Sequence, residues 1–498
     1  MKKTIALLPV DARPVTYDLP KDLAKIANWN LLIPEKRDLG FMKSRANIDK
    51  VFSWLEQVMP KVDGIIVSVD MLLYGGLVPS RINDEALEVI EGRLAKFIEL
   101  KEVHPQVKIM AFSSTMRLSN SYVDEEEKEY WSSYGKEIWK YSFYSHKYER
   151  QGDPKAREIA EELEQKIPAD ILADYLETRK RHFSMNQKLI SYLEKGLFDS
   201  LVFPQDDTSE YGLNIREQEQ LYKIRNEKQL FNKMLIYPGA DEVASVLTAR
   251  MIYALEGEKL PRFYPIYSGT SGVKSIARYE DRPLEQSVTG QIDALGSHTV
   301  ESPKEADILF GVNVPGNKQG DHALQEDMDK VDTNARNISE WLKKLNFYKG
   351  ENKLIAIADV AYANGADPVM VPQLLQAFEP HELAGYAGWN TAGNTIGTVV
   401  AHSALVHLAG QNGYDYEAEH EKQITLRLLD DYLYQAIVRP RIRKQVPDEK
   451  EQDRLLDTLH KEFIPAAEEL LSSIDSSVKL ERVCLPWDRT FEIGIFLK

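Results

Sequence analysis

Short apolar runs separated by long amphipathic stretches set the pattern of the first four hundred residues. Most of the runs are continuous rather than alternating, as expected for strands that helices cover on both faces. The runs are Ile5–Pro9, Leu31–Pro34, Gly64–Val69, Lys108–Phe112, Leu201–Pro204, Met234–Tyr237, Phe263–Tyr267, Asp307–Val312, Leu354–Ile357 and Leu383–Ala387. The stretches between them, such as Asp84–Leu100, have helical periodicity. This strand–helix alternation predicts an α/β fold with a mainly parallel sheet.

The number of these runs exceeds the strands of a single closed (β/α)8 barrel, which favours a division of the chain. Residues 1–258 are predicted to form a (β/α)-barrel-like catalytic unit with a helical insertion at 124–195. Residues 259–410 are predicted to form a doubly wound α/β unit that includes a further strand at His298. Residues 411–498 are predicted to be a helical region that ends in a hairpin. The alternative is one large barrel that borrows its last strands from the 260–410 region.

Charge and cysteine content narrow the classes of partner. The 78 acidic residues outnumber the 62 basic residues, the net charge is −16, and no basic stripe is present. Nucleic acid is therefore not expected as a partner. Cys484 is the single cysteine, which rules out a disulfide framework within one chain. No apolar run approaches ~18 residues and Ile5–Val10 is short for a signal sequence, so we expect no membrane span and a cytoplasmic protein.

Polar and aromatic residues collect directly after the predicted strands, where parallel α/β sheets bind their ligands. Helix caps and turns account for many residues of this kind, and the acidic run at 123–129 is expected to form a solvated helix. The collection as a whole is too acidic and too aromatic for capping alone. The candidates for substrate binding are Asp11, Arg13, Asp70, Tyr74, Arg81, Glu210, Asp241, Tyr267, Trp389 and Asn390.

The most specific feature is the pair Asp206–Asp207, which follows the run Leu201–Pro204. Two adjacent carboxylates should raise the pKa of one of them, which supplies an acid/base group beside an electrostatic stabiliser. The pair could bind a divalent metal together with Asp11, Asp70 and Asp241. It could also cleave a glycosidic bond, and adjacent acids suit the substrate-assisted form of that reaction. A capped loop with solvated acids is the other interpretation.

Four segments carry a resemblance to known proteins: LLPVDARPVTYD, SVDMLLYGGLVPSR, FPQDDTSEYG and GYAGWNTAGNT. In these segments the chain resembles a bacterial family known as domain of unknown function 4127, over nearly its whole length. It is also similar to β-N-acetylgalactosaminidases and related β-N-acetylhexosaminidases, and its adjacent aspartates resemble the catalytic pair of barrel-fold O-GlcNAcase-type enzymes. The resemblance implies that Asp206 polarises a substrate acetamido group and that Asp207 is the catalytic acid/base.

We therefore expect a glycoside hydrolase that releases terminal β-linked N-acetylhexosamine with retention, N-acetylgalactosamine being favoured. It is expected to need no cofactor and no metal, and its partner is a small carbohydrate rather than nucleic acid or a membrane. A homodimer is left open. The alternatives are a divalent-metal-dependent hydrolase or lyase that uses the same aspartates, and a non-catalytic sugar-binding protein.

Overall fold

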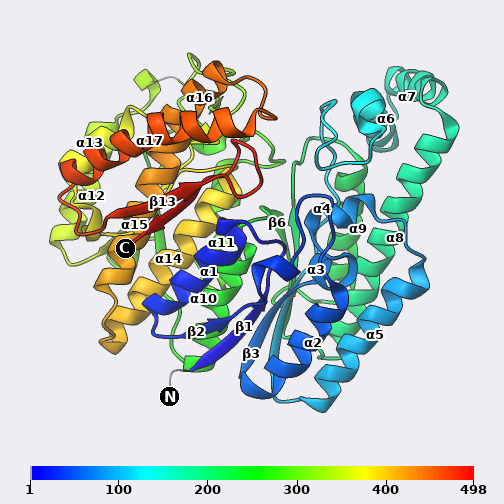
Figure 1. The fold of residues 1–498 in the computed structure, drawn as a ribbon, viewed down its shortest axis with the longest axis horizontal. Coiled ribbons are helices and arrows are strands. Elements are labelled where there is room, and N and C mark those ends of the chain that lie inside the picture. Colours follow the sequence, from blue (N-terminus) through cyan, green and yellow to red (C-terminus); the bar gives the residue numbers. More distant parts are fainter. Residues whose placement is uncertain (1–2, 332) are drawn as a thin grey trace. The chain divides into compact units, whose positions relative to one another are not determined.

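The computed structural model describes residues 3–331 and 333–498, and the chain divides into two compact units (Figure 1). The N-unit comprises Thr4–Ala12 and Leu32–Ala240. The C-unit comprises Met1–Lys3, Arg13–Leu31 and Asp241–Lys498. These two units do not coincide with the domains predicted from the sequence, whose boundaries lie near residues 258 and 410. The predicted domain boundaries therefore stay predictions.

A six-stranded sheet with the order β2-β1-β3-β4-β5-β6 organises the N-unit. Its strands are β1 (Thr4–Leu8), β2 (Asn30–Leu32), β3 (Gly64–Ser68), β4 (Lys108–Phe112), β5 (Ser200–Gln205) and β6 (Met234–Pro238). The strands β1, β3, β4, β5 and β6 pair in parallel. Every residue of β3 and of β5 is buried, which is the pattern of strands covered on both faces.

The helices of the N-unit follow its strands along the chain. They are α2 (Ile48–Val58), α3 (Val69–Tyr74), α4 (Leu77–Ile82), α5 (Leu87–Val103), α6 (Trp131–Gln151), α7 (Pro154–Lys166), α8 (Ala169–Glu194) and α9 (Leu213–Glu227). Helices α6, α7 and α8 lie within the range 124–195 of the predicted insertion, and α6 and α7 lie side by side (Figure 1). Trp131 and Tyr175 of the insertion pack in one core cluster with Met116 and Leu213. This cluster ties the insertion to the segments that follow β4 and β5.

A second parallel sheet, with the order β12-β10-β8-β7, organises the C-unit. Its strands are β7 (Phe263–Tyr267), β8 (Ile308–Asn313), β10 (Leu354–Asp359) and β12 (Leu383–Ala387), and the short strands β9 (Gly320–Asp321) and β11 (Tyr362–Ala363) pair separately. The prediction of a strand at His298 is wrong, because no strand within the described residues contains it. Its neighbour Thr299 forms an isolated β-bridge to Phe263.

The helices of the C-unit pack on this sheet and on one another. They are α1 (Pro14–Ile26), α10 (Val243–Glu256), α11 (Leu284–Leu295), α12 (Ile338–Gly350), α13 (Met370–Ala377), α14 (Ala392–Asn412), α15 (Glu417–Arg427), α16 (Arg439–Gln445) and α17 (Gln452–Ser473). Between α15 and α16, Leu428–Val438 (η6) is a π-helix. Gly385 allows α14 to approach β12, because a Cβ there would lie 3.3 Å from the Val399 carbonyl oxygen.

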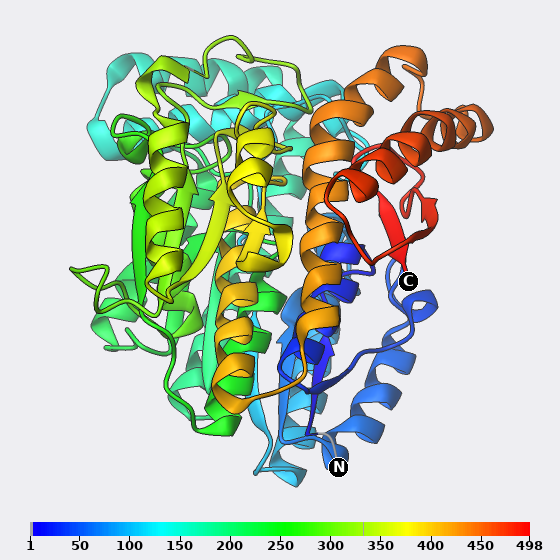
Figure 2. The same ribbon diagram turned by 90° about the vertical axis from the view of Figure 1, so that its left-hand side faces the viewer.

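The C-terminal region has its own hydrophobic core. The predicted hairpin is confirmed as the antiparallel strands β13 (Leu480–Cys484) and β14 (Gly494–Leu497). Figure 2 shows this red hairpin beside the orange-red helix α17. Leu459 and Phe463 of α17, Tyr434 of η6 and Val483 of β13 share one core cluster.

The two parallel sheets and their helices confirm the predicted α/β fold class. Among the described helices, none has the length and apolar content that a membrane span requires.

Candidate active site

The Asp206–Asp207 pair directly follows Gln205, the last residue of β5. The strand end is held from both sides: Gly239 donates its N–H to the Gln205 carbonyl, and Gln205 Nε2 donates to Thr115 Oγ1 at 2.9 Å. Asp207 has a φ of 44°, in the left-handed region that non-glycine residues seldom adopt. The turn therefore breaks the strict alternation of strand side chains exactly at this pair, so that adjacent carboxylates can serve one site.

Two arginines and one glutamate join the two aspartates into a chain of alternating charge. Arg81 Nη2 donates to Asp206 at 2.7 Å, and its Nη1 donates to Glu126 at 2.9 Å. Arg117 Nη2 lies 3.0 Å from the same Glu126 carboxylate, and its Nη1 donates to Asp207 at 3.3 Å. The side chain of Arg81 is 2% exposed, whereas those of Asp206 and Asp207 are 18% and 26% exposed. Arg81 is thus buried, whereas Arg117, at 17%, and both carboxylates keep access to solvent.

The pKa of Asp207 is raised to about 7. Burial is the largest cause and the neighbouring charge of Asp206 is the next, while Arg117 and Arg81 oppose them. The raised pKa favours a protonated Asp207, while Asp206 is engaged in an ion pair with Arg81. The pair provides a proton donor next to a carboxylate, which is the division of roles that acid/base chemistry requires.

Arg117, Glu126 and Glu127 belong to this network and were not among the predicted site residues. Arg117 Nε donates to Glu127 at 2.9 Å, and Glu127 is 3% exposed. The expectation of a solvated helix at 123–129 is wrong, because this segment forms turns whose acids fold back onto Arg117. The position of Arg117 shortly after β4 could have indicated a site residue. Nothing in the acidic run 123–129 indicated that Glu126 and Glu127 would join the site.

Asp70 and Tyr74, both on α3, lie in a buried polar cluster. Asp70 is 0% exposed and accepts hydrogen bonds from Ser114 N at 2.9 Å and Ser114 Oγ at 2.8 Å. His182 Nε2 lies 3.2 Å from Asp70 and its ring stacks on Tyr74 with the centroids 5.4 Å apart. Burial alone would raise the pKa of Asp70, but the hydrogen bonds from His182 and Ser114 lower it. These contacts indicate that Asp70 and Tyr74 stabilise the segments that follow β3 and β4.

The two other candidates of the N-unit differ in exposure. Asp11 follows β1 and is 5% exposed. Glu210 is exposed in the loop after Asp207, and it contacts the hydroxyl of Tyr211. Burial raises the pKa of that phenol, and the contact with Glu210 raises it further. Of the predicted residues in this unit, the structure brings Arg81 into direct contact with the aspartate pair.

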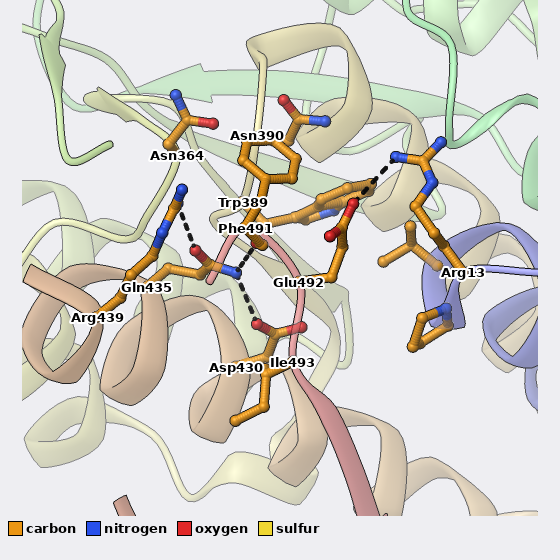
Figure 3. A pocket seen from close by; sticks show the side chains of 12 residues that line it. Arg13, Asn364, Trp389, Asn390, Asp430, Gln435, Arg439, Phe491, Glu492 and Ile493 are labelled. Atoms are coloured by element: carbon orange, nitrogen blue, oxygen red, sulfur yellow. Dashed lines mark hydrogen bonds and ion pairs between the residues drawn. The ribbon is translucent and has the colours of Figure 1, made fainter. Parts of the chain in front are cut away.

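Arg13, Asp241 and Asn390 form a separate cluster in the C-unit. Arg13 donates from Nη2 and Nη1 to the two Asp241 oxygens at 2.6 and 3.1 Å, and Asn390 Nδ2 donates to Asp241 at 3.1 Å. Trp389 is 7% exposed and donates from Nε1 to Thr398 Oγ1 at 3.3 Å. Arg13, Trp389 and Asn390 line one pocket (Figure 3). Tyr267, at the end of β7, is half-buried, and burial raises the pKa of its hydroxyl.

Within residues 3–331 and 333–498, no group of three or more His, Cys, Asp or Glu side chains has an arrangement that could hold a metal ion.

Of three comparisons with known proteins, one found a match. Neither the curated proteins nor the solved structures contain a match to this chain. A family model described as "Protein of unknown function (DUF4127)" matches residues 5–496. This match covers nearly the whole chain and confirms that part of the resemblance found in the sequence. The protein with this aspartate pair at the end of β5 is thus a member of the DUF4127 family.

Proposed function

We propose that this protein is a glycoside hydrolase that releases terminal β-linked N-acetylhexosamine, with N-acetylgalactosamine favoured, by a retaining, substrate-assisted mechanism. The observation that carries the proposal is the division of roles within one dipeptide. Asp207 has a pKa of about 7, whereas Asp206 next to it is ion-paired with Arg81 at 2.7 Å. A reaction that needs an acid and a carboxylate side by side fits this arrangement.

In the first step of the proposed reaction, Asp207 gives its proton to the glycosidic oxygen. The carbonyl oxygen of the 2-acetamido group attacks C1 as the bond from C1 to the leaving oxygen breaks. Asp206 accepts a hydrogen bond from the acetamido N–H and stabilises the positive charge that develops on the ring formed. The leaving group departs as an alcohol, and Asp207 is left as a carboxylate.

In the second step, the Asp207 carboxylate removes a proton from a water molecule that attacks C1. The bond from C1 to the acetamido oxygen breaks, the amide is restored, and Asp207 is protonated again. Two successive inversions at C1 give a product of retained β configuration. A single residue acts first as acid and then as base, so its pKa should lie near the working pH, as the value of about 7 does.

The arginine–glutamate chain supports these roles. Arg81 holds Asp206 in place, while Arg117 lies at 3.3 Å from Asp207 and limits how far its pKa rises. Glu126 forms ion pairs with both arginines, and its negative charge reduces the repulsion between them. We assign Arg81, Arg117 and Glu126 as positioning residues.

The proposal also includes the predicted barrel-like arrangement and the predicted substrate-binding residues. A barrel-like arrangement of the N-terminal strands would put the ends of β1, β3 and β5 around one sugar. Asp11 and Glu210 remain candidates for hydroxyl contacts in that arrangement. Asp70 and Tyr74 are better candidates for support than for substrate contact, because both are almost fully buried.

A panel of p-nitrophenyl glycosides, assayed with and without a chelator, tests the proposal. We expect release of p-nitrophenol from the β-N-acetylgalactosaminide that a chelator does not reduce, with the β anomer as the first sugar product by proton NMR. Activity that a chelator abolishes and Mg²⁺ or Mn²⁺ restores would instead favour the metal-dependent hydrolase. Tight sugar binding without turnover would favour the non-catalytic protein.

A further inference from the structure

Helix α6 of the insertion holds the far end of the loop that carries the aspartate pair. This loop, residues 206–212, joins β5 to α9, and α6 lies against α9 (Figure 1). Gly212 donates its N–H to His146 Nδ1 at 3.2 Å, and Leu213 donates its N–H to Ser142 Oγ at 2.6 Å. Two side chains of α6 therefore accept hydrogen bonds from the start of α9, where N–H groups lack acceptors within their own helix.

The surroundings of His146 fix its ring for this role. The residue is 1% exposed, and its ring lies edge-on to the Tyr211 ring with the centroids 5.9 Å apart. Because Nδ1 accepts from Gly212, a neutral ring carries its hydrogen on Nε2, which lies 3.4 Å from Glu219 of α9 and donates to it. One imidazole thus connects the end of the loop to the second turn of α9.

The end of the loop fits closely between α6 and α9. A Cβ at residue 212 would lie 2.5 Å from Asn214 Oδ1 and 3.4 Å from Ser142 Oγ, so glycine permits this approach. Asn214 is 2% exposed and Ser142 is 1% exposed. The contacts that fix the loop end are therefore shielded from water, which would otherwise compete for the same hydrogen bonds.

Helix α8 of the insertion holds the arginine that faces Asp207. Arg179, which is 2% exposed, donates from Nη1 to the Arg117 carbonyl at 3.3 Å. Its Nε and Nη2 donate to the carboxylate of Glu217 on α9 at 2.9 and 2.6 Å. The insertion therefore contacts the segments that carry both members of the ion pair between Arg117 and Asp207.

The backbone of Asp207 depends on anchors of this kind. Its φ of 44° lies in the left-handed region, and a non-glycine residue stays there only where its surroundings impose it. Before the pair, the loop is fixed at Gln205, which is hydrogen-bonded to Gly239 and Thr115. After the pair, it is fixed at Gly212 by α6. Release of either end would let Asp207 return to an ordinary conformation.

We propose that His146, with Ser142 four residues before it on α6, is a positioning residue for the Asp206–Asp207 pair. Loss of its acceptor frees the Gly212 end of the loop and lets the Asp207 carboxyl turn away from the place where it gives its proton. A displacement of about 1 Å near a reacting group can lower a rate by ~10²-fold. The effect on catalysis rests on the proposed function, whereas the hold on the loop is measured without a substrate.

Hydrogen exchange followed by mass spectrometry tests the hold on the loop. We expect amides within residues 206–213 to exchange about five- to tenfold faster in His146→Ala than in the wild type, because a hydrogen bond is lost. His146→Asn, whose Oδ1 can take the place of Nδ1, should exchange at close to the wild-type rate. His460→Ala, at an exposed histidine on α17, is the matched control and should change nothing in this loop.

Unchanged exchange in His146→Ala, or no recovery in His146→Asn, would overturn the proposal. If His146→Ala does not fold, Ser142→Ala removes the other acceptor of the loop end by deletion of a single oxygen. It should likewise speed exchange within residues 206–213, and unchanged exchange there would overturn the proposal too.

The same variants test the effect on catalysis with p-nitrophenyl β-N-acetylgalactosaminide. His146→Ala should lower kcat by about tenfold or more and change KM little, because Asp207 is displaced while the groups that bind the sugar are kept. His146→Asn should recover most of the lost kcat. Faster exchange with an unchanged kcat would overturn the positioning role. If the wild type releases no p-nitrophenol, the proposed function fails, and the exchange comparison alone decides whether His146 holds the loop.

Discussion

The chain contains two pairs of adjacent aspartates, which differ in backbone context and in exposure to solvent. Asp206 and Asp207 follow a strand, and their side chains are 18% and 26% exposed. Asp430 and Asp431 lie within the π-helix η6, and their side chains are 11% and 0% exposed. Both pairs are held by arginine, and in both the second aspartate has a raised pKa, to about 7 in Asp207 and about 8 in Asp431, chiefly through burial.

The difference lies in what the carboxylates can reach. Asp431 accepts hydrogen bonds from Gly388 N at 2.8 Å and from Arg427 Nη1 at 3.0 Å, so its oxygens are consumed by the protein itself. Asp207 is met by Arg117 at the longer distance of 3.3 Å and stays open to solvent. A perturbed pKa marks a candidate site only together with access to a substrate, because structural pairs perturb pKa values as well.

The largest expected effect separates the two pairs by catalysis. Asp207→Asn removes the proton donor and should lower kcat/KM for an aryl β-N-acetylgalactosaminide by ~10²–10⁴-fold. Asp431→Asn should leave kcat/KM per folded molecule unchanged and cost ~1–3 kcal/mol of stability through its two hydrogen bonds. Steady-state kinetics and urea unfolding of both variants measure the contrast. Equal loss of activity in the two variants would contradict the distinction.

A smaller effect concerns the pH at which activity declines. Asp207 must be protonated to donate, so activity should fall as pH rises past about 7. Asp206→Asn removes a charge that raises the pKa of Asp207 and should shift this limb to lower pH by ~1 unit. Arg117→Gln removes a charge that lowers it and should shift the limb to higher pH. Arg216→Gln, a surface variant on α9, is the matched control. Shifts in the same direction would contradict the assignment.

The smallest effect is a difference in the pH dependence of stability. In the native protein burial raises the pKa of Asp431 to about 8 and that of Asp207 to about 7, whereas both groups titrate near pH 4 in the unfolded chain. Each group therefore lowers stability as pH rises from about 4, by up to ~1.4 kcal/mol per pH unit. Asp431→Asn should flatten the decline up to pH 8, and Asp207→Asn only up to pH 7. Urea unfolding at pH 5, 6.5 and 7.5 distinguishes the two ranges.

Much of the fold could be predicted from local pattern. Lys108–Phe112, Phe263–Tyr267 and Leu383–Ala387 are strands with the predicted bounds, because each is a short apolar run between polar or turn-forming residues. The placement of Asp206 and Asp207 at a strand end follows from the same pattern. Periodicity could not reveal the π-helix Leu428–Val438 inside the predicted helical region 411–498, since an apolar helical face looks alike in both geometries.

The candidate site was predicted only in part, because its network depends on contacts distant in sequence. Glu126 and Glu127 look like a solvated acidic run, and only the fold brings them to Arg117 and Arg81. Asp70 is the opposite case: its position after β3 suggested substrate contact, and nothing in the sequence indicated its hydrogen bonds with Ser114 and His182. A single sequence shows which residues are polar, but not which of them find partners within the protein.

The central claim is that Asp206 and Asp207 act together with a 2-acetamido group of the substrate. The most direct measurement compares kcat/KM for p-nitrophenyl β-N-acetylgalactosaminide with that for the matched p-nitrophenyl β-galactoside, which carries a hydroxyl at C2. We predict that the acetamido substrate is hydrolysed at least ~10³-fold faster, because the hydroxyl substrate lacks the internal nucleophile. Similar rates on the two substrates, or turnover of neither, would contradict the account.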